Sequence, residues 1–155
     1  MIGDLAALRH MPATSALAEL VFIDTNIILY AALGRQDTPE KWAIARDLMS
    51  KSDFAVSSQV LAEFYHNAVR KGRVPLIEAE ALAWVTTLAK RPCQAIDSDL
   101  VQGGIAVSTR YKISYWDGSI VAAARRLSAK TVYSEDLNHG QKYEEIRVIN
   151  PFLIT

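Results

Sequence analysis

Short apolar runs recur along the chain, and segments long enough to form helices separate them. The runs span residues 21–24, 54–57, 93–96, 131–134 and 146–149. Continuous apolar runs of this length are typical of strands in a parallel sheet covered on both faces, because neither face then needs polar side chains. We therefore predict a central, mostly parallel sheet of four to five strands, with residues 146–149 as the fifth.

Six segments of helical length fill most of the chain between these strands. They are residues 25–34, 38–51, 58–71, 76–90, 98–111 and 115–128. Strands that alternate with helices form right-handed crossovers, which place helices on both faces of the sheet. The pattern therefore predicts an α/β fold with three layers, α/β/α. The length of 155 residues fits one domain, which we place at residues 21–155 after an N-terminal extension, residues 1–20, of unknown role.

Acidic residues stand where strands give way to helices. Asp24 follows the first strand, and Asp136 follows the strand at residues 131–134. Asp117 opens the helix at residues 115–128 and shares a face with the apolar residues three, four and seven positions further on, so its carboxylate should point inwards. Ligands of open parallel sheets bind at the edge where strands end. We therefore expect these three aspartates to lie at one site.

Glu63 lies on the border of the apolar face that the helix at residues 58–71 presents to the sheet. Asn67 comes one turn later, near enough to hydrogen-bond the Glu63 carboxylate. A carboxylate that leans towards the sheet needs a cation or a hydrogen-bond donor to offset its loss of water. Glu63 is therefore the fourth candidate for the same site.

Each of these carboxylates also has an ordinary structural explanation. Aspartates commonly cap helices or occupy turns, which would account for Asp24, Asp117 and Asp136, and a border glutamate such as Glu63 is commonly solvated. The case for a metal site rests on all four meeting at one sheet edge. Four carboxylates at such short separations cannot all ionise without a cation, because like charges raise one another's pKa. An all-oxygen ligand set selects one or two Mg²⁺ or Mn²⁺ ions.

Other polar groups are left out of this site. Asp97 and Asp99 also follow a strand, but a helix N-cap and a first-turn acid explain them sufficiently. Cys93 is the single cysteine, which excludes an intramolecular disulfide, and the histidines lack the spacing of a zinc site. None of these residues therefore offers an alternative to the four carboxylates as the metal site.

Charge and hydropathy restrict the partners. The 17 basic and 17 acidic residues balance, but setting four carboxylates aside around a metal leaves 13 acidic against 17 basic residues, a mildly basic remainder. We find no segment with the roughly 20 uncharged residues that a membrane span needs, and no pattern of a secretion signal near the start. We expect a cytoplasmic protein without a membrane partner.

Four sequence blocks add a further pattern, in the order FIDTN, SSQVLAEF, SYWDGSIVAAA and YSEDLNHG. With the closing Asn150-Pro151-Phe152 they extend over about residues 21–152, and together they resemble the PIN-domain nucleases and, within them, the VapC-like toxins of bacterial toxin–antitoxin pairs. The resemblance puts an acidic quartet at the four carboxylates above and polar helpers at Asn26 and Ser134. Gly118 departs from the pattern, since relatives often have alanine there, and we expect it to loosen the start of its helix.

The resemblance implies a Mg²⁺- or Mn²⁺-dependent endoribonuclease. It would hydrolyse RNA with three aspartates as metal ligands, and with Glu63 as a ligand or as the group that orients the water. It implies a homodimer held inactive by a small antitoxin, with no specific DNA binding of its own. We expect the antitoxin in an apolar groove between the first helices, bordered by Trp42, Tyr65 and Phe64, although core packing suits Phe64 better. The candidates for contact with the RNA backbone are Arg35, Lys41, Arg70, Lys71 and Arg73.

Other functions stay open at this stage. A degenerate PIN module that binds RNA or protein without catalysis would keep the fold, and a structure-specific DNA nuclease would keep the chemistry. A phosphotransfer protein would also place an aspartate at a strand end. The haloacid dehalogenase pattern, however, requires a second aspartate where this chain has Asn26, and a receiver domain requires a lysine where it has Glu135.

Overall fold

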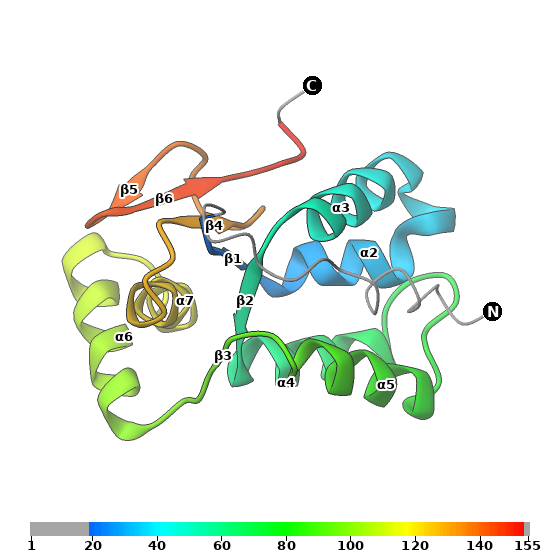
Figure 1. Ribbon diagram of the computed structural model, residues 1–155, viewed down its shortest axis with the longest axis horizontal. Helices are drawn as coiled ribbons and strands as arrows, with labels where there is room; N and C mark the ends of the chain where they lie inside the picture. Colours follow the sequence, from blue (N-terminus) through cyan, green and yellow to red (C-terminus); the bar gives the residue numbers. More distant parts are fainter. Residues whose placement is uncertain (1–18, 154–155) are drawn as a thin grey trace.

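The computed structural model describes residues 19–153, so all but the last two residues of the expected extension at residues 1–20 lie outside the described residues (Figure 1). Within that part, six strands form one sheet in the order β3-β2-β1-β4-β6-β5. Every neighbouring pair is parallel except β5 and β6, which are antiparallel. The predicted α/β class with a mostly parallel sheet is confirmed. The strands are β1 (Val21–Ile23), β2 (Phe54–Ser57), β3 (Cys93–Gln94), β4 (Thr131–Tyr133), β5 (Lys142–Tyr143) and β6 (Ile146–Ile149).

The sheet has one strand more than the sequence predicts, because β5 covers only two residues. Its hairpin with β6 turns at Glu144 and Glu145, without the asparagine or glycine that usually marks such a turn. Glu144 adopts a left-handed backbone with φ 57°. Tyr111 and Arg125 fix it there, since the Tyr111 hydroxyl accepts from the Glu144 N–H at 2.6 Å and Arg125 pairs with its carboxylate. These partners are distant in sequence, so a local pattern does not reveal the turn.

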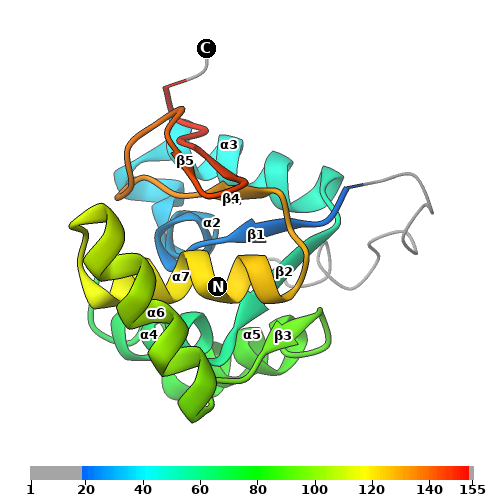
Figure 2. The ribbon, with the colours of Figure 1, turned by 90° about the vertical axis from the view of Figure 1, so that its left-hand side faces the viewer.

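Six helices of the described residues lie on the two sides of the sheet. Figures 1 and 2 show α6 and α7 on one side and the other four on the opposite side, which makes the predicted three layers. The helix bounds differ from the predicted segments by a few residues at their ends. The helices are α2 (Thr25–Asp37), α3 (Pro39–Lys51), α4 (Ser58–Ala68), α5 (Glu78–Leu88), α6 (Ser98–Tyr111) and α7 (Tyr115–Arg126).

The apolar runs form the strands because they fill the space between the two helix layers. Phe22, Val56, Val132 and Val148 come from four adjacent strands and are completely buried. Polar residues at the strand ends then begin the helices. Asp24, for example, ends β1 and caps α2, with its side chain accepting a hydrogen bond from the Thr25 N–H. The same residues that stop the strands therefore start the helices.

Helix α7 lies close against α6 through two glycines. A Cβ at Gly118 would stand 2.4 Å from the Gly104 carbonyl oxygen and 2.9 Å from the Ser108 nitrogen. A Cβ at Gly104 would in turn lie 3.1 Å from the Ser119 Cα. The expectation that Gly118 loosens its helix is therefore wrong. The missing side chain lets α7 approach α6, and this packing fixes the helix that carries Asp117.

The order in which strands are added to the sheet reverses at β1, which makes this the switch point of the sheet. The first two crossovers run outward from β1 to β2 and β3, and the third returns to β4 on the other side of β1. Ligands of such sheets bind outside the carboxyl ends of the strands at this point. Residues 24–26, which follow β1, and residues 134–136, which follow β4, lie at this point of the sheet. In the described part of the chain, no helix is long and apolar enough to cross a membrane.

Candidate active site

Asp24 is the buried member of the site, with 5% of its surface exposed. One carboxylate oxygen accepts a 2.7 Å hydrogen bond from the Thr25 N–H, and the other accepts a 2.7 Å bond from the Ser134 hydroxyl. Ser134 follows β4, which pairs with β1, and it is fully buried. The pairing of β1 with β4 therefore brings together two side chains that are 110 residues apart.

Burial raises the pKa of Asp24 from 3.8 to about 7, because the ionised carboxylate loses water. The hydrogen bonds from Ser134 and Thr25 oppose this shift, while the charges of Asp136 and Glu63 add to it. A nearby cation would reverse the balance and favour the ionised form. Asp24 therefore has the electrostatic environment of a group that a metal ion would stabilise.

Glu63 extends from α4 to the same place through two partners. Thr25 donates its hydroxyl hydrogen to Glu63 Oε2 at 3.2 Å, and Gln59 donates an amide hydrogen to Oε1 at 2.9 Å. Asn67 does not fulfil the expectation for it, because its amide donates to the Glu63 backbone carbonyl, not to the carboxylate. Both oxygens of Glu63 are thus held by side chains that the sequence analysis did not assign to the site.

Asp117 lies in the first turn of α7, where its N–H donates to the Ser114 hydroxyl at 3.1 Å. Desolvation raises the pKa of its carboxyl, and the charges of Asp136 and Glu63 add to the effect. These charges also act on Asp24. The four carboxylates predicted from the sequence therefore lie close enough to interact electrostatically, although they come from four separate segments.

Asp136 is the exposed member of the site, and Asn26 positions it. The Asn26 amide donates to Asp136 Oδ2 at 3.0 Å, and its carbonyl oxygen accepts from the Glu135 N–H at 3.2 Å. Ser134 accepts from the Asp136 N–H at 3.1 Å while it donates to Asp24. Asn26 and Ser134, both predicted as polar helpers, thus connect the two aspartates that follow β1 and β4.

Lys41, a candidate for contact with RNA, has protein partners in the structure. Its half-buried ammonium pairs with Glu135 and donates to the Tyr30 hydroxyl at 3.1 Å. It also lies 4.7 Å from the ring centre of Tyr30 and 5.1 Å from that of Phe152. Tyr30 in turn donates to Glu135 at 2.7 Å. This cluster holds the segment that carries Asp136, so Lys41 has a structural partner instead of a free charge.

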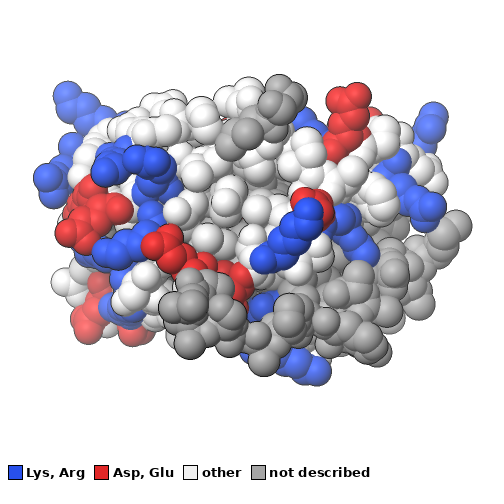
Figure 3. Space-filling model, turned by 45° about the horizontal axis from the view of Figure 1, so that its top comes forward, with Lys and Arg blue, Asp and Glu red and all other residues white. Residues whose placement is uncertain are grey.

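The other basic candidates lie around the C-terminal ends of α2 and α4. The Arg35 guanidinium lies 5.8 Å from the Trp42 ring centre, and Arg70 lies 3.5 Å from the His66 Nε2 atom. Arg73 donates its N–H to the Asp37 carboxylate at 2.8 Å. On the face in Figure 3, the basic side chains of described residues stand in separate groups, several beside acidic ones. That face carries no continuous basic stripe among its described residues.

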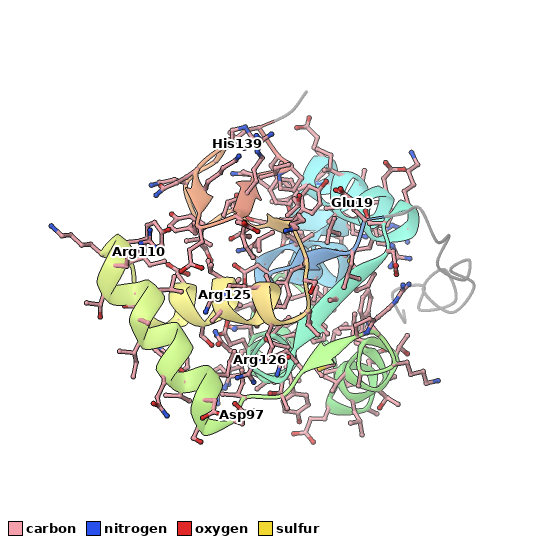
Figure 4. All side chains as sticks on the ribbon, turned by 60° about the vertical axis from the view of Figure 1, so that its left-hand side comes forward. Glu19, Asp97, Arg110, Arg125, Arg126 and His139 are labelled. Atoms are coloured by element: carbon pink, nitrogen blue, oxygen red, sulfur yellow. The ribbon has the colours of Figure 1, made fainter. Side chains whose placement is uncertain are left out.

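Asp97 is the N-cap of α6, the role that the sequence analysis expects for it. It caps α6 through the Leu100 N–H at 2.8 Å, and both its oxygens accept from Arg126 at 3.0 Å. Figure 4 shows Arg126, at the end of α7, beside Asp97 at the start of α6. Hydrogen bonds and this ion pair lower the pKa of Asp97. Its function in the structure is to join α6 to α7.

The four carboxylates suit a hard divalent cation by their chemistry. All candidate donors are oxygens, and two of the carboxyls have raised pKa values that a cation would lower. Among the described residues, no three acidic, histidine or cysteine side chains are close enough, as they stand, to surround an ion. Ser134, Thr25 and Asn26 each donate a hydrogen bond to one of the carboxylates.

Comparison with known sequences gives the family. A profile of the PIN domain matches residues 21–145, which is most of the chain. The protein belongs to the PIN domain family. No curated protein sequence matches it. The match covers the segments that carry all four carboxylates.

Solved structures with this PIN fold include toxins. VapC20 of Mycobacterium tuberculosis, described as a sarcin–ricin loop cleaving toxin, is 18% identical, with a TM-score of 0.59 over 75% of this chain and 89% of its own. A toxin–antitoxin complex from Klebsiella pneumoniae is 17% identical, with a TM-score of 0.61 over 84% and 97%. FitAcB of Neisseria gonorrhoeae is 17% identical, with a TM-score of 0.59 over 86% and 99%. At these identities the likeness concerns the fold.

Two grooves flank the PIN-domain site. The first, of about 260 Å³, runs along α2 past Leu29, Tyr30 and Leu33 to Lys71, and we call it the α2 groove. The second, of about 590 Å³, lies between α4 and the start of α7, and we call it the Trp116 groove. Phe64 borders neither, because it is fully buried and packs on Trp84. Tyr65 and Trp42 do not line the α2 groove either, and their place at an antitoxin groove stays a prediction.

Thr25 and Gln59 are the site residues that the sequence analysis missed. Gln59 is four positions before Glu63 on one helix, a spacing at which side chains meet, so this signal was present. Thr25 bonds a residue 38 positions away, and only the juxtaposition of α2 and α4 reveals it.

Proposed function

We propose that this chain is a metal-dependent endoribonuclease and the toxin of a toxin–antitoxin pair. The observation that carries the proposal is the position of four carboxylates at the switch point of a PIN-domain sheet, with the pKa of the buried Asp24 raised to about 7. A protein that buries such a carboxylate among other acids gains nothing in stability from it. A cation-binding site would explain why the protein carries the free-energy cost of burying this carboxylate.

The residues present indicate how the work would be divided. Asp24, Asp117 and Asp136 would hold one or two Mg²⁺ or Mn²⁺ ions, which supply an activated water and neutralise charge on the scissile phosphate when bound. Glu63, fixed on both oxygens by Thr25 and Gln59, would orient the water or add a ligand. Ser134 and Asn26 would keep the aspartates in place. We expect products with a 5′-phosphate and a 3′-hydroxyl.

The test is cleavage of total cellular RNA by the purified chain, with product ends mapped by sequencing. We expect cuts that need Mg²⁺ or Mn²⁺, that chelator abolishes, and that Asp24→Asn and Asp117→Asn remove. A double variant that cuts as fast as the wild type would contradict this site. Preferred cleavage of DNA in a parallel reaction would replace RNA by DNA as the substrate, and tight metal-independent RNA binding without turnover would support a non-catalytic module.

The partner proposal rests on the α2 groove. Its floor is apolar, through Leu29 and Leu33, and it begins at Asn26, beside the carboxylates. An antitoxin segment with apolar anchors and one basic side chain would fill the groove and reach the acidic site, which electrostatic complementarity favours. The solved relatives of this fold include toxin–antitoxin complexes. We expect Leu33→Glu to abolish co-purification with an antitoxin encoded next to this gene and to leave RNA cleavage intact.

A further inference from the structure

The indole of Trp116 is the most exposed tryptophan ring of the chain and lies next to a candidate metal ligand. It is 61% exposed, whereas Trp84 is 1% exposed and Trp42 is half-buried. Asp117 follows it directly in the first turn of α7. An aromatic ring exposed beside a site offers a large apolar face with a polar handle, which suits recognition of a ligand bound there.

The surroundings of Trp116 form a groove that continues into the carboxylate cluster. Glu63 and Trp116 both line the Trp116 groove, and Gln59 connects them, donating to the Glu63 carboxylate at 2.9 Å and to the Trp116 carbonyl at 3.4 Å. Tyr115 supports the indole with an edge-on ring contact, at 5.1 Å between ring centres. The ring is therefore braced on one side and open to the groove on another.

The lining of the Trp116 groove combines apolar and aromatic side chains with a few polar ones. Glu63 is the acidic residue of its lining, and the other polar residues include His66 and the amides of Gln59 and Asn67. Arg70 follows the C-terminal end of α4, and its guanidinium lies 3.5 Å from the His66 Nε2 atom. A ligand next to Asp117 would meet the aromatic face of Trp116, with the amides and His66 also lining the groove. An aromatic ring with polar side chains near it suits an unpaired base.

We propose that the Trp116 groove is a subsite for a nucleobase next to the scissile phosphate, with Trp116 as the ring on which an unpaired RNA base stacks. The proposal deepens the proposed function and rests on it, since it takes a single-stranded RNA segment as the ligand. A phosphate at the carboxylates leaves the neighbouring nucleotide within reach of the indole. Stacking accepts every base, while the amide oxygens of Gln59 and Asn67 can accept hydrogen bonds from base edges. Cleavage in loops follows from this arrangement, because paired bases cannot leave their stack without cost.

The test uses the full chain with Asp24→Asn, so that RNA is not cut, and measures binding of a labelled single-stranded RNA in Mg²⁺ by fluorescence anisotropy. In this background we expect Trp116→Ala to raise Kd about tenfold, the effect of losing one base–aromatic stack. Trp116→Phe should stay within about threefold, because it keeps an aromatic face. Leu82→Ala is the matched control, since Leu82 is 59% exposed on α5 and lines neither groove.

A second arm separates stacking from a structural effect. The same strands are measured with single abasic nucleotides introduced one by one along the RNA. At one position, the loss of the base should cancel the effect of Trp116→Ala, whereas a structural role would leave that effect at every position. A Kd that Trp116→Ala does not change, or an effect that no abasic position cancels, would overturn the subsite.

The outcomes for the subsite and for the enzyme are distinct. RNA cleavage by the wild type, together with binding that does not depend on Trp116, overturns the subsite alone. Base-dependent binding through Trp116 without cleavage by the wild type overturns the nuclease and retains the subsite. If Trp116→Ala instead converts a dimer to a monomer in sedimentation and leaves RNA affinity unchanged, a second copy covers this face and the subsite is wrong.

Discussion

Asp24 and Asp136 follow neighbouring parallel strands, yet one carboxylate is buried and the other is exposed. Asp24 is held by a buried hydroxyl and a backbone N–H, and burial raises its pKa to about 7. Asp136 is held by the amide of Asn26 at the surface. The difference indicates that the cost of assembling the acids falls mainly on Asp24. A bound cation would therefore stabilise the ionised form of Asp24 more than that of Asp136.

The largest expected effect is the loss of RNA cleavage in Asp24→Asn, on the order of 10³-fold or more, because the buried charge that would face the ion is removed. Asp136→Asn should also impair cleavage, which initial rates at fixed Mg²⁺ measure. The two variants should differ in the metal-free state. Asp24→Asn should be more stable than wild type at pH 8, and Asp136→Asn should not. Equal changes in the stability of the metal-free protein in the two variants would contradict the difference between Asp24 and Asp136.

The pH dependence of stability tests the same contrast. A carboxyl whose pKa rises from 3.8 in the unfolded chain to about 7 on folding keeps its proton in the folded state between these values. Without divalent ions, the contribution of Asp24 to stability should therefore be greatest below pH 4. It should fall as the pH rises through 7 and then level off. The full difference corresponds to about 4 kcal/mol. Urea unfolding at several pH values should show a much flatter profile for Asp24→Asn, and a wild-type profile that rises through this window would contradict the account.

The hydrogen bonds that hold the two carboxylates are expected to matter less than the carboxylates. Ser134→Ala removes the donor to Asp24, and Asn26→Ala removes the donor to Asp136; each should reduce cleavage about tenfold to a hundredfold. Asn138→Ala is a control, since its amide donates to Gln141 outside the site. Metal titrations of cleavage rate should show a higher Mg²⁺ requirement for Ser134→Ala. Full activity in both variants would show that the carboxylates need no such positioning.

The smallest effects concern the helix that carries Asp117. Gly118→Ala should lower the free energy of unfolding by about 1–3 kcal/mol, because its methyl group would meet the backbone of α6 at 2.4 Å. Gly103→Ala, in α6, meets only Ala122 at 3.7 Å and should be neutral or stabilising by up to about 1 kcal/mol. Thermal unfolding of both variants measures the difference. A stabilised Gly118→Ala would mean that α6 and α7 separate easily.

The fold was predictable where a local pattern carries it. The apolar runs at β1, β2 and β4 lie between two helix layers, so continuous hydrophobicity is a direct consequence of their position. The β5–β6 turn was not predictable from a local pattern, because Arg125 and Tyr111 fix Glu144 through tertiary contacts.

The site divides in the same way. The four carboxylates could be located from strand ends and the family pattern, since topology alone brings strand ends together. Their partners depend on atomic packing, as shown by the bond from Thr25 to Glu63, and by Lys41, whose charge suggested RNA but whose partner is Glu135. The roles assigned to all these residues are still predictions.

The most direct test of a cation at Asp24 is calorimetric titration of Mn²⁺ into the full chain, with buffers of different ionisation enthalpy to count released protons. The account predicts binding that releases protons at pH 6.5, where Asp24 is largely protonated, and few at pH 8.5. In Asp24→Asn, it predicts weaker binding with no such pH dependence. Mn²⁺ binding of equal affinity and equal proton release in the wild type and Asp24→Asn would contradict the claim that the buried carboxylate holds the metal.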